Sequence, residues 1–130
     1  VNENDVVSIT ELMFTDNDEL SGEIAKMTRA DALFILSNID GMYDGDPDSE
    51  DTHIIQEVPY GHSVEEYVQN KKSSAGRGGM QSKCHTAQTV AEAGIEVFLA
   101  RGTREHVLTD LVFKRGNVPH THFSPKKQSL

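Results

Sequence analysis

The chain has 130 residues and a mass of 14.4 kDa, which is the size of one compact domain and too small for two ordinary ones. Hydrophobic residues make up 36% and charged residues 25%, so the composition indicates a globular protein rather than a disordered or fibrous one. No apolar run is long enough to cross a bilayer, and a single cysteine, Cys84, excludes an internal disulfide framework and a four-cysteine zinc site. We therefore expect a cytoplasmic protein with no membrane partner.

Charge is distributed unevenly between the two halves of the chain. Residues 1–66 hold 17 Asp and Glu against only Lys26 and Arg29, whereas residues 67–130 hold 10 Lys and Arg against 4 acidic residues. The net charge of −9 disfavours nucleic acid as a partner, because an acidic surface repels phosphates. The basic half is compatible with a local anion site, and the acidic half with a site for a cation or an ammonium group. Solvent-exposed helix faces that happen to differ in charge would give the same numbers of charged residues.

The first half of the chain predicts one helix between two strands. Residues 6–9 have the composition of a short strand, and a helical pattern of apolar residues follows, with Asn17 or Asp18 as its N-cap. The run Ala32–Leu36 is apolar without alternation, which predicts a strand buried on both faces of a parallel sheet. Ser37–Thr52 is a long polar loop that follows this strand, at the position where open α/β sheets bind ligands.

The second half predicts further alternation of strands and helices. An edge strand at Ile54–Val58 precedes a short helix at His62–Gln69. A flexible, basic, glycine-rich connection at Lys71–Gly79 leads to a helix at Met80–Ala93, which Gly94 ends. The last elements are a strand at Ile95–Ala100, a helix at Arg104–Leu111 and a strand at His120–Phe123. This order predicts an α/β fold with a mostly parallel sheet and helices on both faces.

The most specific local feature is the run Gly-Arg-Gly-Gly-Met-Gln-Ser-Lys at residues 76–83. Its glycines let the backbone approach a ligand closely, and the helix that follows offers free N–H groups at its positive end. Lys83 adds a full positive charge near the same place. The run therefore indicates a phosphate site, although it is neither a Walker loop nor a dinucleotide fingerprint. A flexible connection with incidental lysines would also account for it.

The acidic and histidine-containing segments do not predict a metal site. Asp44, Asp46 and Asp48 have the spacing of a calcium loop, but Ser49 stands where glycine is required and Ile55 where the bidentate glutamate belongs. The two histidines of the last predicted strand face the same side, with no third ligand in view. Two Asn- and Asp-rich runs, at residues 2–5 and 16–18, suit a ligand with an ammonium group or a metal, although turns and caps would also use such residues.

Four short motifs occur in order along the chain. They are Val-Asn-Glu-Asn-Asp at 1–5, Asp-Asn-Asp-Glu-Leu-Ser at 16–21, Ser-Asn-Ile-Asp-Gly-Met-Tyr at 37–43 with Asp46-Pro47 after it, and Gly-Gly-Met-Gln-Ser-Lys at 78–83. They resemble Ile-Asn-Glu-Asn-Asp, Asp-Asn-Asp-x-Leu-Ser, Thr/Ser-Asp-x-x-Gly-Leu-Tyr with Asp-Pro, and Gly-Gly-Met-x-Thr-Lys of the glutamate 5-kinase family, within the amino acid kinase superfamily. The departures are Asn38 for the usual aspartate and Arg77 and Ser82 for the usual threonines.

The resemblance implies a role for each matching residue. It implies that Lys83 stabilises charge on the transferring phosphoryl group and that Asp18 orients the catalytic lysines. The residues that would hold L-glutamate are Asn2, Asp5, Asp16 and Asn17. The residues that would bind ATP with Mg²⁺ are Ser37, Asn38, Gly41, Tyr43, Asp46, Arg77, Gly78, Gly79, Met80, Gln81, Ser82 and Lys83.

The resemblance also implies a function and its limits. It covers only the second, ATP-binding half of that family's kinase domain, so residues 1–130 would be a single partial domain without the PUA domain that follows in many members. The implied reaction is phosphorylation of the glutamate γ-carboxylate, the first step of proline biosynthesis, in a homo-oligomer that proline inhibits. We expect the isolated chain to be inactive. The alternatives are the kinase half of a bifunctional pyrroline-5-carboxylate synthase, another kinase of the superfamily, or a non-catalytic nucleotide-binding fragment.

Overall fold

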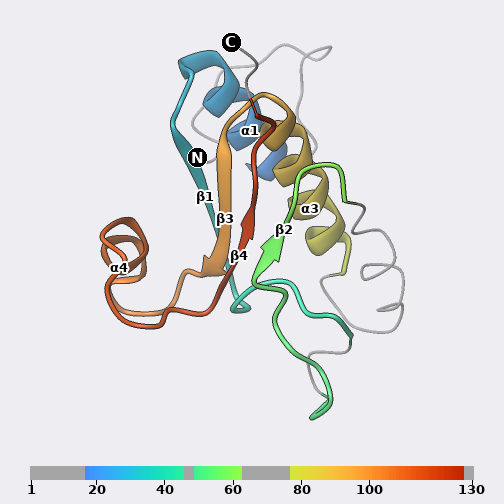
Figure 1. The fold of residues 1–130 in the computed structure, drawn as a ribbon, viewed down its shortest axis with the longest axis vertical. Coiled ribbons are helices and arrows are strands. Elements are labelled where there is room, and N and C mark those ends of the chain that lie inside the picture. The colour runs from blue at the N-terminus through green and yellow to red at the C-terminus, as the bar shows by residue number, and fades with distance from the viewer. Residues whose placement is uncertain (1–16, 46–48, 63–76, 128–130) are drawn as a thin grey trace.

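The computed structural model describes residues 17–45, 49–62 and 77–127 (Figure 1). The predicted strand at residues 6–9 lies outside them, as does the predicted helix at 62–69 beyond its first residue. Most of the other predicted elements are present, with ends shifted by one to three residues. The described elements are α1 (Asn17–Thr28), β1 (Ala32–Ser37), β2 (Glu57–Val58), α3 (Arg77–Glu92), β3 (Glu96–Arg101), α4 (Val107–Val112) and β4 (His120–Phe123).

The four strands form one mixed sheet in the order β1-β3-β4-β2. Strands β1 and β3 are parallel, with Ser37 beside Arg101, and β2 is parallel to β4 at the edge. Strands β3 and β4 are antiparallel, with Val97 beside Phe123. The expected mostly parallel α/β sheet is therefore confirmed, with one antiparallel pair at its centre. As a result, the carboxyl ends of β1 and β3 lie at one end of the sheet, and those of β2 and β4 at the other.

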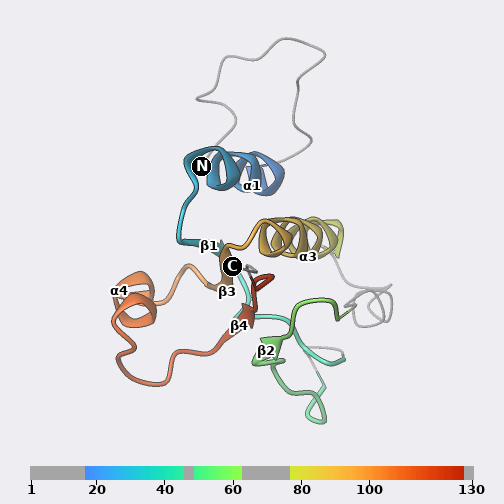
Figure 2. The ribbon, with the colours of Figure 1, turned by 45° about the horizontal axis from the view of Figure 1, so that its top comes forward.

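Helices α1 and α3 lie side by side over one face of the sheet, and α4 lies off the other face (Figure 2). The core between α3 and the sheet includes Met42, Val90, Val97, Leu99 and Phe123, none more than 1% exposed. On the opposite face, the ring of Phe98 stacks on Phe34 and on His122. Strand β1 is therefore less covered than its apolar run predicts, and Leu36 remains 41% exposed. Among the described residues, we find no helix with the length and apolarity to cross a membrane.

Three predicted helix boundaries differ from the structure. Helix α3 begins at Arg77, so Gly78 and Gly79 belong to the helix and not to the connection before it. Helix α1 already includes Asn17, so neither Asn17 nor Asp18 is its N-cap. Helix α4 begins three residues later than predicted, after His106, whose left-handed backbone (φ 61°) cannot belong to an α-helix.

The end of α3 confirms its prediction. Gly94 has a φ of 87°, in the left-handed region that glycine adopts without steric cost, and its N–H donates to the Ala91 carbonyl oxygen. The chain then turns directly into β3, so α3 runs antiparallel to β3. Since α3 has 16 residues and a helix rises by about 1.5 Å per residue, it spans about 24 Å and returns to the carboxyl end of β3. The amino end of α3 therefore lies where β1 and β3 end.

Candidate active site

A close contact between two helices prepares the site. Gly22 is buried on α1, and a Cβ atom added there would lie 2.9 Å from Thr86 Cγ2 and 3.2 Å from Val90 Cγ2, both on α3. Only a residue without a side chain lets the two helices approach this closely. One turn before Gly22 on the same face of α1 is Asp18, and one turn before Thr86 on α3 is Lys83. The packing therefore brings these two side chains face to face.

The two predicted catalytic residues form an ion pair. Lys83 Nζ donates to Asp18 Oδ2 over 2.9 Å, and their side chains are 20% and 18% exposed. The pair joins residues 65 positions apart in the sequence. The ammonium group of a lysine is carried on a flexible chain of four carbons. A carboxylate at hydrogen-bond distance restricts the positions that this group can adopt. The pair therefore fixes a positive charge near the amino end of α3 without removing it completely from solvent.

The amino end of α3 coincides with the predicted nucleotide motif. The backbone N–H groups of residues 77–80 have no partner within an α-helix, and they lie at the positive end of the helix dipole. Lys83 lies at the end of the second turn rather than in the first turn, as the sequence predicted, because the helix begins three residues earlier. A helix amino end with an ammonium group on the same helix suits an anion such as a phosphate group.

The loop after β1 touches this helix. The Cys84 thiol lies 3.8 Å from the Met42 sulfur, and both residues are buried, as expected for a lone cysteine that acts as a small core residue. Because Cys84 follows Lys83, and Met42 lies between Gly41 and Tyr43, this contact joins two of the predicted nucleotide motifs. In the same loop, the Ser37 hydroxyl donates to Asn38 Oδ1 over 3.4 Å, and the Asn38 side chain is exposed at the carboxyl end of β1.

Several predicted site residues cannot be compared with the structure. Asn2, Asp5 and Asp16 of the predicted glutamate site, and Asp46 of the predicted nucleotide site, lie outside the described residues. Asn17 is described: it is exposed at the first position of α1, directly before Asp18.

The structure adds a charged cluster that sequence reasoning missed. Asp40 Oδ1 accepts hydrogen bonds from Arg101 Nε at 3.0 Å and from Arg104 Nε and Nη2 at 3.3 and 3.2 Å. Asp40 follows the end of β1, Arg101 is the last residue of β3 and Arg104 follows it, and the two strands lie side by side. The available signal was the position of Arg101 at the end of a predicted strand, since the carboxyl ends of parallel strands meet at one edge.

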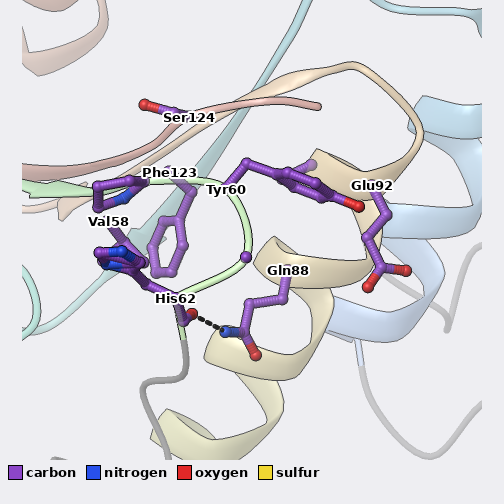
Figure 3. Close-up of a pocket in the computed structure, with 10 residues that line it drawn as sticks. Val58, Tyr60, His62, Gln88, Glu92, Phe123 and Ser124 are labelled. Carbon is purple, nitrogen blue, oxygen red and sulfur yellow. Dashed lines mark hydrogen bonds between the residues drawn. The ribbon is translucent and has the colours of Figure 1, made fainter. Parts of the chain in front are cut away.

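A cavity of about 280 Å³ lies at the other end of the sheet, beside the carboxyl ends of β2 and β4 and the last turns of α3 (Figure 3). Its floor includes Phe123, and the Gln88 side chain crosses its rim to donate to the His62 carbonyl oxygen. None of the predicted site residues lines it. No group of three or more His, Cys, Asp and Glu among the described residues could hold a metal ion.

Together, the fold and the site define a class of protein. The model of the amino acid kinase family matches residues 1–101, so the chain belongs to the amino acid kinase family. It is 48% identical over 130 residues to the glutamate 5-kinase of Bacteroides thetaiotaomicron and 46% identical over 128 residues to that of Chlorobaculum tepidum. These matches cover 100% and 98% of the chain, but only 36% and 34% of the two relatives. The chain therefore spans about a third of the length of these relatives.

Solved structures give the same fold. The carbamate kinase of Giardia lamblia bound to AMP-PNP superimposes with a TM-score of 0.64 at 20% identity, over 96% of this chain and 40% of that one. The UMP kinase of Ureaplasma parvum superimposes with a TM-score of 0.61 at 16% identity, over 85% of this chain and 43% of that one. At these identities the likeness concerns the fold alone.

Proposed function

We propose that this chain forms the ATP-binding half of a glutamate 5-kinase, which transfers the γ-phosphoryl group of ATP to the γ-carboxylate of L-glutamate. The single observation that carries the proposal is the 2.9 Å pair of Lys83 and Asp18 at the amino end of α3. The pair joins a motif specific to the glutamate 5-kinase family with the glycine-rich motif of the nucleotide site. The identity of 46–48% to two glutamate 5-kinases over nearly the whole chain supports the same substrate.

The nucleotide part of the proposal uses two segments that the fold brings together. The backbone N–H groups at the start of α3, from Arg77 to Met80, would bind phosphate oxygens, and Gln81 and Ser82 extend the same turn. The loop after β1, from Ser37 to Tyr43 with Asp46 beyond it, would hold the rest of the nucleotide at the carboxyl end of the sheet. Mg²⁺ would accompany ATP as its phosphate complex and neutralise part of the phosphate charge.

Phosphoryl transfer requires in-line positioning and charge stabilisation more than covalent chemistry from the protein. The Lys83 ammonium, oriented by Asp18, would interact with oxygens of the phosphoryl group as it passes between donor and acceptor. An interaction that strengthens as charge redistributes lowers the barrier instead of merely tightening ATP binding. Asn17, next to Asp18, would lie on the acceptor side and contact glutamate together with Asn2, Asp5 and Asp16. The product is an acyl phosphate.

The same resemblance supports four further parts of this proposal. The complete enzyme would act in the cytoplasm as a homo-oligomer, and proline would inhibit it at the glutamate site. Residues 1–130 would be a partial domain, so the isolated chain would not turn over glutamate.

The test is an acceptor-dependent assay on the full-length protein that contains residues 1–130. With Mg²⁺-ATP and L-glutamate, we expect ADP release and an acyl phosphate that hydroxylamine traps as a hydroxamate. Aspartate, UMP and carbamate serve as control acceptors. ADP release that another acceptor stimulates and glutamate does not would contradict the proposal.

A further inference from the structure

We infer that Asp40 is a positioning residue for the nucleotide: with Arg101 and Arg104 it fixes the loop after β1 in the conformation that binds ATP. This inference rests on the proposed function, because it assigns a role in that same site. None of the three residues is among those that the motifs assign to the nucleotide. Their role would be to fix the position of the loop that carries the assigned residues.

The Asp40 side chain holds one side of the loop. Its Oδ1 atom accepts from two guanidinium groups at 3.0–3.3 Å, and the side chain is only 17% exposed. Hydrogen bonds between ionised groups are about twice as strong as neutral ones, and partial burial reduces their screening by water. The Gly102 N–H donates to the Ser37 carbonyl oxygen at 2.8 Å, which ties the same two segments through the backbone. The loop is therefore fixed to the end of β3 over the residues on either side of Asn38.

Thr121 of β4 holds the other side of the loop. The Met42 N–H donates to Thr121 Oγ1 at 2.9 Å, and that hydroxyl donates to the Ile55 carbonyl oxygen at 2.6 Å. Thr121 is completely buried, and a Cβ atom at Gly41 would lie only 2.8 Å from its Oγ1, so the backbone at Gly41 packs directly on this hydroxyl. Two neighbouring strands of the sheet, β3 and β4, thus hold the segment 40–42 through separate contacts.

The two anchors alternate with the residues that the motifs assign to ATP. Asp40 lies two positions after Asn38 and one before Gly41, and Met42 lies one before Tyr43. A loop released at Asp40 would keep its buried anchor at Thr121 and its backbone hydrogen bond at Ser37, but it could move between them, at Asn38. The two guanidinium groups would then repel each other without a shared counter-ion. The expected result is weaker nucleotide binding, with the transfer step itself preserved because Lys83 and Asp18 are held by other elements.

The experiment measures the dissociation constant of a fluorescent ATP analogue and steady-state kinetics in the full-length protein. Asp40→Ala removes the acceptor, Asp40→Asn keeps its shape without the charge, and Asp31→Asn is the control, an exposed aspartate at the opposite end of β1. We expect Asp40→Ala to weaken nucleotide binding and raise the KM for ATP about five- to tenfold, the scale of one ordinary hydrogen bond. The kcat and the KM for glutamate should change less than about twofold. The KM for ATP of Asp40→Asn should lie between those of the wild type and Asp40→Ala, and this variant serves as the test if Asp40→Ala does not fold.

A double variant separates positioning from direct contact. If the arginines act through Asp40, adding Arg101→Gln to Asp40→Ala causes little further loss, because coupled residues are not additive. A further loss of about fivefold or more would mean that Arg101 contacts the nucleotide itself and would overturn the positioning role. Normal nucleotide binding by both Asp40 variants would also overturn it. A wild-type protein that binds ATP but does not phosphorylate glutamate would contradict the proposed function and leave the binding comparison for Asp40 valid.

Discussion

The two ends of the sheet are built from different interactions. Where β1 and β3 end, polar pairs join residues far apart in the sequence: Lys83 with Asp18, and Asp40 with Arg101. At the other end, where β2 and β4 end, the apolar ring of Phe123 forms the floor of a cavity and is 1% exposed. This difference indicates that stability and chemistry are separated in the fold. Buried apolar side chains stabilise the end at β2 and β4, and oriented charged side chains lie at the end of β1 and β3. Changes at the two ends should therefore have different consequences.

The largest expected effect is on stability, at the end away from the site. Phe123→Ala removes a ring that is buried between α3 and the sheet, and we expect a loss of about 3–5 kcal/mol in the free energy of unfolding. The enzyme that remains folded should keep the wild-type KM for ATP. Urea unfolding of the full-length protein, followed by kinetics in native conditions, measures both. A changed KM with unchanged stability would contradict the separation of the two ends.

The contact at Gly22 joins the packing of α1 on α3 to the geometry of the site, so it tests the separation of stability from chemistry directly. Gly22→Leu forces α1 away from Thr86 and Val90, and we expect a loss of about 1–3 kcal/mol in stability, as for other overpacked sites. Because the same displacement moves Asp18 from Lys83, the kcat should fall as well. Thr28→Leu, at an exposed position of the same helix, is the control for an added leucine. A fall in stability with normal kcat would mean that the ion pair does not depend on the helix contact.

A smaller effect is expected on the acceptor side. Asn17→Ala removes an exposed amide beside the Lys83–Asp18 pair, and we expect the KM for glutamate to rise about tenfold, the scale of one hydrogen bond to a charged substrate. The KM for ATP should stay the same. Glu23→Gln, which lies further along α1 and pairs with Lys26, is the matched control. An increase in the KM for ATP instead would indicate that the two substrate sites have been exchanged.

Local patterns were sufficient to predict most of the fold. Apolar runs predicted β1 and β3 to within one residue, and Gly94 predicted the end of α3. The start of α4 was wrong because polar residues before Val107 fit a helical pattern, whereas the left-handed backbone of His106 depends on the turn that it makes. The start of α3 was wrong because glycines have low helix propensity, and here they form the first turn of a packed helix.

The candidate site was less predictable from local patterns. The roles of Lys83 and Asp18 came from a family resemblance, and no spacing argument joins residues 65 positions apart. Gly22 gave no signal in the sequence, since its function is the close approach of another helix. The cluster of Asp40 with two arginines depends on which strands become neighbours, and the order β1-β3 is a property of the whole sheet.

The central claim is that Lys83, held by Asp18, stabilises the transferring phosphoryl group. The direct test is Lys83→Met in the full-length protein, which keeps the length of the side chain but removes its charge. We predict that kcat falls by about a hundredfold or more, the scale for loss of one preorganised donor, while nucleotide affinity falls much less. The control is Lys26→Met, which removes a lysine at the far end of α1. A near-normal kcat combined with a loss of ATP binding would contradict the claim and make Lys83 an anchor for the bound nucleotide only.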